Sequence, residues 1–487
     1  MKNNHQKAPL YEALTAYGLK ANAVPFDVPG HKFGKAIPTQ FKDDVGEAIF
    51  KLDVNSMKEL DSLSNPTGVI KEAESLAADL FCADHAFFLV NGSTSGVQKM
   101  ILSTCSDGDK IILPRNIHKS AFNAIILSGA HPIYIDPVID ETSGVSMGVR
   151  TNDIKQAIDS HPDAKAIFIL HPTYFGYTSD LKAIIDYAHQ KDIAVLADQS
   201  HGSHFSLHPD FPTSAIALGA DMATISMHKT GGSLTQSSIL LHNNGIVPFS
   251  RVRSTINIFQ TSSASYLLLA SLDIARKQLA LEGKDRFERL LNLVKLAAKK
   301  LNKLKGIDVL GSDHLDGDAM HSFDPTKLTI NMSAFGMSGF KVYDYFKTHY
   351  NIQLELGETH VVLAVVSLGD DETSLNTLVE AFTDFSKTHK LSDKDAVKSV
   401  QLQTPEMVYT PRHAFFKPSM LIDLNKSVGM ISADSIMVYP PGIPLVVPGE
   451  KITERIIKDY EYLNRENNIL IGAHHKDDDI YIKVLKP

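Results

Sequence analysis

Short apolar runs alternate with amphipathic stretches along the first half of the chain. Strands are predicted at 86–90, 110–113, 132–135, 166–170, 193–197, 222–226 and 238–241. Apolar residues recur at helical spacing between most of these strands, and also at 68–80, before the first strand. This alternation predicts an α/β fold with a mostly parallel, doubly wound sheet. Nearly continuous apolar runs, such as AIFIL at 166–170, fit strands that are buried on both faces.

The pattern changes after residue 265. Long helices are predicted at 266–281 and 286–304, and strands follow near 326–331 and 361–367. A polar stretch at 387–398 precedes a last part with a Pro/Gly-rich loop at 439–450. Because 487 residues exceed what one core holds, several domains are expected. We predict an N-terminal arm (1–65), a large domain (66–285), a smaller α/β domain (286–390) and a C-terminal α+β domain (391–487).

The composition limits the kinds of molecule that the protein is expected to bind. The formal net charge of −8 argues against binding to nucleic acid or to an anionic membrane. No apolar run is long enough to span a bilayer, and the first residues, MKNNHQKAPL, lack the apolar core of a secretion signal. Cys82 and Cys105 are predicted to be buried free thiols in a reducing compartment. We therefore expect a cytoplasmic protein that acts on a small molecule.

Polar residues gather where the predicted strands end. The hydroxyl-rich loop NGSTSG at 91–96 joins a strand to a helix, and backbone N–H groups there, with Ser93, Thr94 and Ser95, can cradle a phosphate. A plain helix cap explains the same loop equally well. Other polar residues at or just beyond strand ends are His118, Tyr174, Asp198, His201, Ser226, His228 and Lys229. In an open α/β sheet these residues meet at one rim, where ligands bind.

Lys229 carries the main chemical hypothesis. It follows a strand and precedes a Gly-Gly turn, and a desolvated lysine is a nucleophile that forms a Schiff base with an aldehyde. Asp198 would pair with a protonated pyridine nitrogen, and His118 would stack on the ring. An ordinary surface lysine is the alternative when Lys229 is considered alone.

Together the motifs resemble one family. PGHK, NGSTSG, NIHKS, HPTYFG, DQSHG, SMHKTGGSLTQSS, SYLLLASLD and YPPGIPLVVPGE are similar to the motifs of the Orn/Lys/Arg decarboxylases. These are group III of the fold-type-I enzymes, which have a transferase-like large domain and depend on pyridoxal 5'-phosphate (PLP). The resemblance covers nearly the whole chain and is to the short Gram-positive type.

The resemblance implies roles for particular residues. Lys229 would form the Schiff base with PLP, Asp198 would pair with the ring nitrogen and His118 would stack on the ring. His201 is also placed among the cofactor-binding residues. The phosphate would be served by Ser93, Thr94, Ser95, Ser226 and His228. Thr261 and Ser262 would reach the phosphate of a neighbouring subunit, which implies a homodimer with shared active sites.

The chain departs from the expected pattern beside Asp198. Gln199 and Ser200 stand where the family more often has Glu-Ala or Ser-Ala, so a hydroxyl replaces the methyl group expected under the ring. Lys58 and Ser62 also stand where some relatives carry acids, which affects the contact to the distal amine of the substrate.

The expected reaction is α-decarboxylation of arginine, lysine or ornithine to an amine and CO2, as in polyamine metabolism. Lys229 or His228 would return the proton to Cα. The distal cation of the substrate needs an acid, and the candidates are Asp53, Glu59, Asp61 and Glu450.

Three alternatives stay open. A transaminase would clamp the α-carboxylate of its substrate with an arginine. No arginine lies between Arg289 and Arg412, so the sequence favours decarboxylation, or another lyase reaction, over transamination. A non-catalytic PLP-binding paralogue would explain Gln199 and Ser200. A metal site at His201, His204 and His208 is disfavoured by its loose spacing, so no metal is expected.

Overall fold

A computed structural model describes residues 4–20, 23–392, 404–438, 443–466, 470–476 and 479–486. The chain divides into two compact units. Unit 1 comprises Met1–Ser103 and Ala197–Glu288, and unit 2 comprises Thr104–Leu196 and Arg289–Pro487. Each unit is described by itself below. No helix in the described part of the chain is long and apolar enough to cross a membrane.

The strands of unit 1 pair antiparallel. β8 (Ser238–His242) lies between β1 (His85–Leu89) and β7 (Met222–Ile225), with Leu240 opposite both Phe87 and Thr224. Between β7 and β8 the chain forms only α10 (Met227–Thr230). A helix of this length spans about 6 Å, which is too short to return the chain along a strand for parallel pairing. β8 therefore runs antiparallel to both of its neighbours, an exception that the predicted mostly parallel fold allows.

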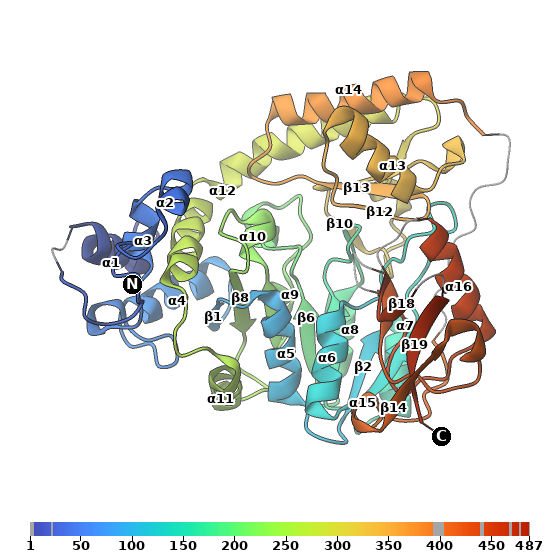
Figure 1. The fold of residues 1–487 in the computed structure, drawn as a ribbon, viewed down its shortest axis with the longest axis horizontal. Helices are drawn as coiled ribbons and strands as arrows, with labels where there is room; N and C mark the ends of the chain where they lie inside the picture. Colours follow the sequence, from blue (N-terminus) through green and yellow to red (C-terminus); the bar gives the residue numbers. More distant parts are fainter. Residues whose placement is uncertain are drawn as a thin grey trace. The chain divides into compact units, whose positions relative to one another are not determined.

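The helices of unit 1 surround these strands. They are α4 (Val69–Leu80), most of α5 (Gly92–Thr104), α9 (Ala215–Leu218), α11 (Phe249–Phe259) and the first part of α12 (Tyr266–Leu301). Two helices were predicted where α12 runs unbroken, because Gly283 stays helical and packs against the side chain of Leu207. The arm contributes α1 (Pro9–Thr15), α2 (Thr39–Val45) and α3 (Ala48–Leu52), and α1 lies beside α4 (Figure 1).

Unit 2 contains the parallel part of the predicted sheet. β2 (Lys110–Pro114) pairs in parallel with β3 (His131–Ile135) and with β4 (Ala166–Leu170). The helices α6 (Lys119–Ser128), α7 (Thr151–Ser160) and α8 (Leu181–His189) alternate with these strands and with β6 (Ala194–Asp198). The order of these three strands is β4-β2-β3, and their parallel pairing is the arrangement that the sequence predicted.

A second sheet of unit 2 is antiparallel, in the order β12-β13-β11-β9. Its strands are β12 (Leu356–Gly357), β13 (Val361–Val365), β11 (Lys327–Asn331) and β9 (Asp308–Val309). The accompanying helices are α13 (Gly339–Tyr345) and α14 (Glu372–Thr388). A two-stranded ribbon joins β5 (Tyr177–Thr178) to β10 (Ser322–Phe323). The strands predicted near 326–331 and 361–367 correspond to β11 and β13.

The last part of unit 2 forms two three-stranded sheets with α15 (Pro411–Phe416) and α16 (Glu454–Arg465). One sheet comprises β14 (Ser419–Asp423), β19 (Asp479–Leu485) and β18 (Ala473–Lys476). The other comprises β16 (Ile443–Val446), β15 (Ile436–Val438) and β17 (Leu470–Ile471). Their shared core includes Ile456, Tyr460 and Val484. Residues 393–398 of the predicted polar boundary and 439–442 of the predicted loop lie outside the described residues.

One cysteine prediction is wrong. Cys105 is buried, and burial, the largest influence, raises the pKa of its thiol to about 12. Cys82 is exposed, because it follows the end of α4 in a left-handed turn at φ 58° that carries the chain toward β1. Both thiols are free.

Candidate active site

The hydroxyl loop forms the first turn of α5. Gly92 takes a left-handed conformation at φ 68°, and no atom lies within 4 Å of the place where a Cβ would stand. Its N–H donates to Gln236 O (2.8 Å), which closes the loop against the chain before β8. Ser93 and Ser95 are buried and Thr94 is exposed. A helix start with open approach, free first-turn N–H groups and hydroxyls suits an anion such as a phosphate.

Ser226 joins this loop from β7. Its Oγ donates to Ser93 Oγ (2.8 Å), and Thr224 Oγ1 also donates to Ser93 Oγ (3.3 Å). Because β1 and β7 both pair antiparallel with β8, they run in the same direction, and the end of β7 comes near the start of α5, which follows β1. Two of the hydroxyls that were predicted to serve a phosphate are therefore in direct contact.

Lys229 lies on the short helix α10, rather than in the strand–turn connection predicted from sequence. The backbone N–H of Lys229 donates to Ser226 O (3.1 Å), so Lys229 is connected to the hydroxyl-bearing residues of the loop. Its side chain is half-buried, and Nζ lies 2.8 Å from His201 Nε2. The predicted nucleophile therefore has an imidazole within reach that can accept its proton.

His228, next to Lys229, is held by a backbone contact. Its Nδ1 lies 2.9 Å from Ser237 O, so Nδ1 carries the hydrogen and Nε2 keeps its lone pair. Burial, the largest influence, lowers the pKa of His228, and the charge of Lys229 lowers it further, against the opposing effect of the bond to Ser237. At neutral pH His228 is therefore a neutral base.

Asp198 ends β6 as a buried carboxylate. Its Oδ1 accepts from the N–H of Ser200 (3.1 Å) and from the hydroxyl of Ser200. No donor among the described residues contacts Oδ2. One carboxylate oxygen thus stays available for an N–H donor such as a protonated ring nitrogen.

Gln199 has a structural part in the same turn. Its N–H donates to Thr224 O (3.0 Å), its Nε2 donates to Gly202 O (2.8 Å), and its Oε1 accepts from Ala215 N (2.7 Å). Gln199, which differs from the residue that the family pattern leads us to expect, therefore holds the loop after β6 and leaves Asp198 and His201 in place.

The remaining predicted site residues lie elsewhere in their units. His118 in unit 2 caps α6, with Nδ1 accepting from Ser120 N (3.2 Å). Thr261 and Ser262 of unit 1 are exposed after α11, and Thr261 Oγ1 accepts from Ser263 N (3.2 Å). The structure brings together Ser93, Ser226, Lys229, His201, Asp198 and His228 as one unit-1 group linked through contacts and neighbouring residues.

Two candidate acids for the distal cation are already engaged. Asp61 accepts N–H groups at the start of α4, including Gly68 N (2.7 Å) and Ile70 N (3.1 Å). Glu450 forms two hydrogen bonds with Arg115, at 2.6 and 2.7 Å, and both side chains are buried. These contacts, between positions 335 residues apart in the second case, have no signal in the sequence.

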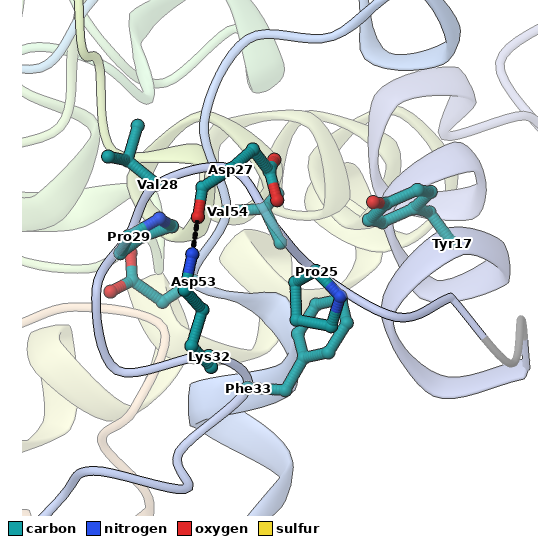
Figure 2. A pocket seen from close by; sticks show the side chains of 9 residues that line it. All are labelled: Tyr17, Pro25, Asp27, Val28, Pro29, Lys32, Phe33, Asp53 and Val54. Atoms are coloured by element: carbon teal, nitrogen blue, oxygen red, sulfur yellow. Dashed lines mark hydrogen bonds between the residues drawn. The ribbon is translucent and has the colours of Figure 1, made fainter.

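The other two candidates lie in the arm. Glu59 is exposed, and Asp53 lines a pocket together with Tyr17, Pro25, Asp27, Val28, Pro29, Lys32, Phe33 and Val54 (Figure 2). Lys32 reaches across this pocket and donates to the carbonyl of Asp27, and Asp53 Oδ2 lies 3.1 Å from His31 Nε2. Asp53 is the one of the four acids that borders this pocket.

The histidines of the metal hypothesis have other partners. His204 Nδ1 contacts Thr230 Oγ1 (3.2 Å), and its ring packs edge-on against Phe211. His208 Nε2 contacts Glu288 Oε2 (2.6 Å). Within the described ranges no three His, Cys, Asp or Glu side chains could together hold a metal ion.

Solved structures share this fold. A lysine decarboxylase from Francisella novicida superposes with a TM-score of 0.86 at 23% identity, covering 98% of this chain and 81% of that one. The constitutive lysine decarboxylase of Escherichia coli gives a TM-score of 0.86 at 21% identity, covering 99% and 82%. The expected fold class is confirmed, because the chain shares the fold of these two solved enzymes.

Sequence comparison gives the family. The model of the Orn/Lys/Arg decarboxylase major domain matches residues 8–374, and that of the Orn/Lys/Arg decarboxylase C-terminal domain matches 394–470. The chain belongs to the Orn/Lys/Arg decarboxylase family. It is 40% identical to the arginine decarboxylase of Bacillus subtilis, over 99% of each chain, and 39% identical to that of Halalkalibacterium halodurans, also over 99% of each.

Proposed function

We propose that the protein is a PLP-dependent α-decarboxylase of a basic amino acid, and that arginine is its substrate. Four relatives that are 39–41% identical to this chain are named arginine decarboxylase. The observation that carries the proposal is the group in unit 1, where an amine, a buried carboxylate and paired hydroxyls stand at the ends of β6, β7 and β1.

The side chains of this group fit PLP. The first turn of α5, with Ser93, Thr94, Ser95 and Ser226, supplies donors for a phosphate. Asp198 offers a free carboxylate oxygen for the ring nitrogen, and Lys229 offers an amine for the aldehyde. When bound, PLP supplies an electron-withdrawing ring that disperses the charge developing at Cα as CO2 leaves.

Protons are handled by the residues around Lys229. Lys229 would have to be a neutral amine to react with the aldehyde of PLP, and His201 Nε2, 2.8 Å from Nζ, would accept the proton that the amine loses. Once the carboxylate has left, Cα needs a proton, and Lys229 or His228 would return it; His228 is neutral, so its Nε2 would first take up the proton that it gives. The bond from His228 to Ser237 O fixes the ring orientation that this exchange requires.

The roles of His118, Thr261 and Ser262 belong to the same proposal. His118 stacks on the ring, and Thr261 with Ser262 serves the phosphate of a second subunit, which makes the protein a homodimer with shared sites. The exposure of Thr261 and Ser262 supports this role, since their hydroxyls are open to a partner. The cytoplasmic location and the three domain boundaries at 65, 285 and 390 remain predictions with the proposal.

The test is an amine-product screen with PLP-loaded protein on arginine, lysine and ornithine. We expect CO2 and the matching amine from arginine, no keto acid, and loss of turnover by at least about a thousandfold in Lys229→Ala. The Lys229→Ala protein should also lose the visible absorbance of bound PLP. An unchanged visible spectrum in this variant, or keto-acid formation by the wild type, would contradict the proposal. The same screen identifies lysine or ornithine as the substrate if arginine is not consumed.

A further inference from the structure

Ser200 is held on three sides beside Asp198. Its N–H and its hydroxyl both donate to Asp198 Oδ1, and its carbonyl accepts from Ser226 N (3.3 Å). Both Ser200 and Asp198 are buried, at 8% and 7% exposure. Water therefore competes little for the carboxylate, and a hydrogen bond to it acts at close to full strength.

We propose that Ser200 weakens Asp198 as a partner of the PLP ring nitrogen by drawing carboxylate charge toward its own hydroxyl. Ser200 is in this sense a positioning residue that acts through Asp198 and does not itself react. The inference deepens the proposed function and rests on it, because the ring nitrogen belongs to PLP.

The direction of the effect follows from the chemistry of the contact. A hydroxyl that donates to one oxygen of a carboxylate draws charge toward that oxygen, so the other oxygen becomes a weaker hydrogen-bond acceptor. Asp198 Oδ2 then binds the proton of a ring N–H less strongly, and the ring is protonated less completely. The alanine that the family pattern leads us to expect at position 200 would leave Oδ1 with only the backbone N–H. This chain should therefore have a milder electron sink than its own alanine variant.

Other groups already support the turn after β6, so its fold does not need the hydroxyl of Ser200. Gln199 fastens the turn to Thr224, Gly202 and Ala215. The backbone of Ser200 keeps its bonds to Asp198 and Ser226 whatever the side chain. Replacing Ser200 by alanine removes one hydrogen bond and leaves the fold of the turn supported.

The experiment measures the ring nitrogen directly. Wild-type protein, Ser200→Ala and Ser200→Thr are loaded with PLP labelled with 15N in the ring, and the nitrogen chemical shift is recorded. We expect Ser200→Ala to move the resonance toward that of protonated pyridine, equivalent to a rise of about one pKa unit of the ring nitrogen. Ser200→Thr retains the hydroxyl and should restore the wild-type resonance.

Ser203→Ala is the matched control. Ser203 is also buried in this loop, but its hydroxyl contacts Thr230 Oγ1 (2.6 Å) instead of Asp198. It should leave the nitrogen resonance unchanged. An identical resonance in Ser200→Ala and wild type, or an equal shift in Ser203→Ala, would overturn the inference while the proposed function stands. A wild-type protein that binds no PLP would overturn both.

Discussion

At the scale of single residues, the surroundings of the site determine which state a side chain occupies. His228 has an ordinary sequence context, but its bond to Ser237 O and its burial make it a neutral base with a known tautomer. Lys229 gains a proton acceptor from His201, which lies 28 residues earlier in the chain. Chemical roles that the motifs only suggest become specific once these contacts are known.

His228→Asn tests the role of the free Nε2. The asparagine amide can still donate to Ser237 O, but it cannot exchange a proton. We expect kcat to fall by about a hundredfold, with the thermal midpoint of unfolding close to that of the wild type. Because the pKa of His228 is lowered, its imidazole is neutral at pH 7 and must take up a proton before it can give one to Cα, so kcat of the wild type should rise as the pH falls toward about 6.5 and below.

Kinetics from pH 5 to pH 9 check this prediction. The rise of the wild-type profile toward acidic pH should be absent or displaced in His228→Asn. A variant with full activity and the same profile would remove His228 from the proton transfer.

At the scale of elements, α4 and α5 depend on Asp61 and Lys99. The sequence predicted another role for Asp61 and none for Lys99. Asp61 satisfies several N–H groups at the start of α4, although it was a candidate for substrate binding. Lys99 on α5 is 1% exposed, and its Nζ donates to Gln260 Oε1 (3.2 Å) just before Thr261 and Ser262. Each contact fixes the end of one element against another.

Asp61→Asn tests the start of α4. Burial opposes the charge of Asp61, but backbone N–H groups of Thr67, Ser62, Gly68 and Lys71 outweigh it and lower its pKa. Its folded-state pKa therefore lies below the ordinary value of 3.8, so its contribution is present above that value and is lost as the pH falls through the folded pKa. Asparagine tolerates the left-handed conformation at this position, φ 68°.

We expect Asp61→Asn to lower the free energy of unfolding by about 1 kcal/mol at pH 7. Denaturant titrations at pH 7 and at pH 3 provide the measurement, and the difference between wild type and variant should be smaller at pH 3. A difference that does not change between the two pH values would show that charge is not the source.

Lys99→Met tests the contact with the segment from 258 to 263. Burial lowers the pKa of Lys99 to about 8, which means that the folded protein bears a cost for this charge below pH 8. The cost diminishes as the pH rises from 8 toward the ordinary value of 10.5, since only the unfolded chain then keeps the proton. Methionine of similar shape should therefore raise the thermal midpoint at pH 7 and have less effect at pH 10.

The same variant should loosen the segment that Gln260 anchors. We expect amide hydrogen exchange at 258–263 to quicken by about tenfold, while Lys284→Met, at an exposed lysine of α12, leaves it unchanged. Equal exchange in wild type and Lys99→Met would show that the contact does not hold this segment.

At the scale of the whole molecule, buried ion pairs join distant parts of the chain within each unit. In unit 1, Asp273 and Arg276 are both fully buried on α12. Asp273 Oδ2 accepts from Leu10 N (2.9 Å), and Arg276 donates to Lys7 O (2.6 Å), which docks the arm. In unit 2, Arg115 joins the segment after β2 to Glu450 of the C-terminal part.

Arg115→Met tests the second of these pairs. Removal of the arginine leaves Glu450 as a buried carboxylate with no cation, and the free energy of unfolding should fall by about 3–5 kcal/mol. The double variant Arg115→Met/Glu450→Gln removes both charges and should recover most of this loss. Denaturant unfolding of the wild type and both variants is the measurement. A double variant as unstable as Arg115→Met would show that packing, not charge, is responsible.

The sequence by itself determined the alternation of strands and helices and the positions of the chemical groups. A continuous local apolar run was enough for β4, whose bounds are those predicted. The motifs around Lys229 and Asp198, with the others along the chain, resemble those of the Orn/Lys/Arg decarboxylases, and this resemblance was enough to predict the family. Both signals lie in short stretches of sequence, so they can be recognised without knowledge of the fold.

Only the tertiary structure decided the pairing direction of β1, β8 and β7, the continuity of α12 and the exposure of Cys82. It also decided what each acid does. Asp61 and Glu450 are ordinary carboxylates in the sequence, and their partners are backbone groups and an arginine that folding brings to them. The contact of Ser200 with Asp198 depends likewise on the turn after β6. Side-chain partners are set by packing between separate segments, which no local pattern encodes.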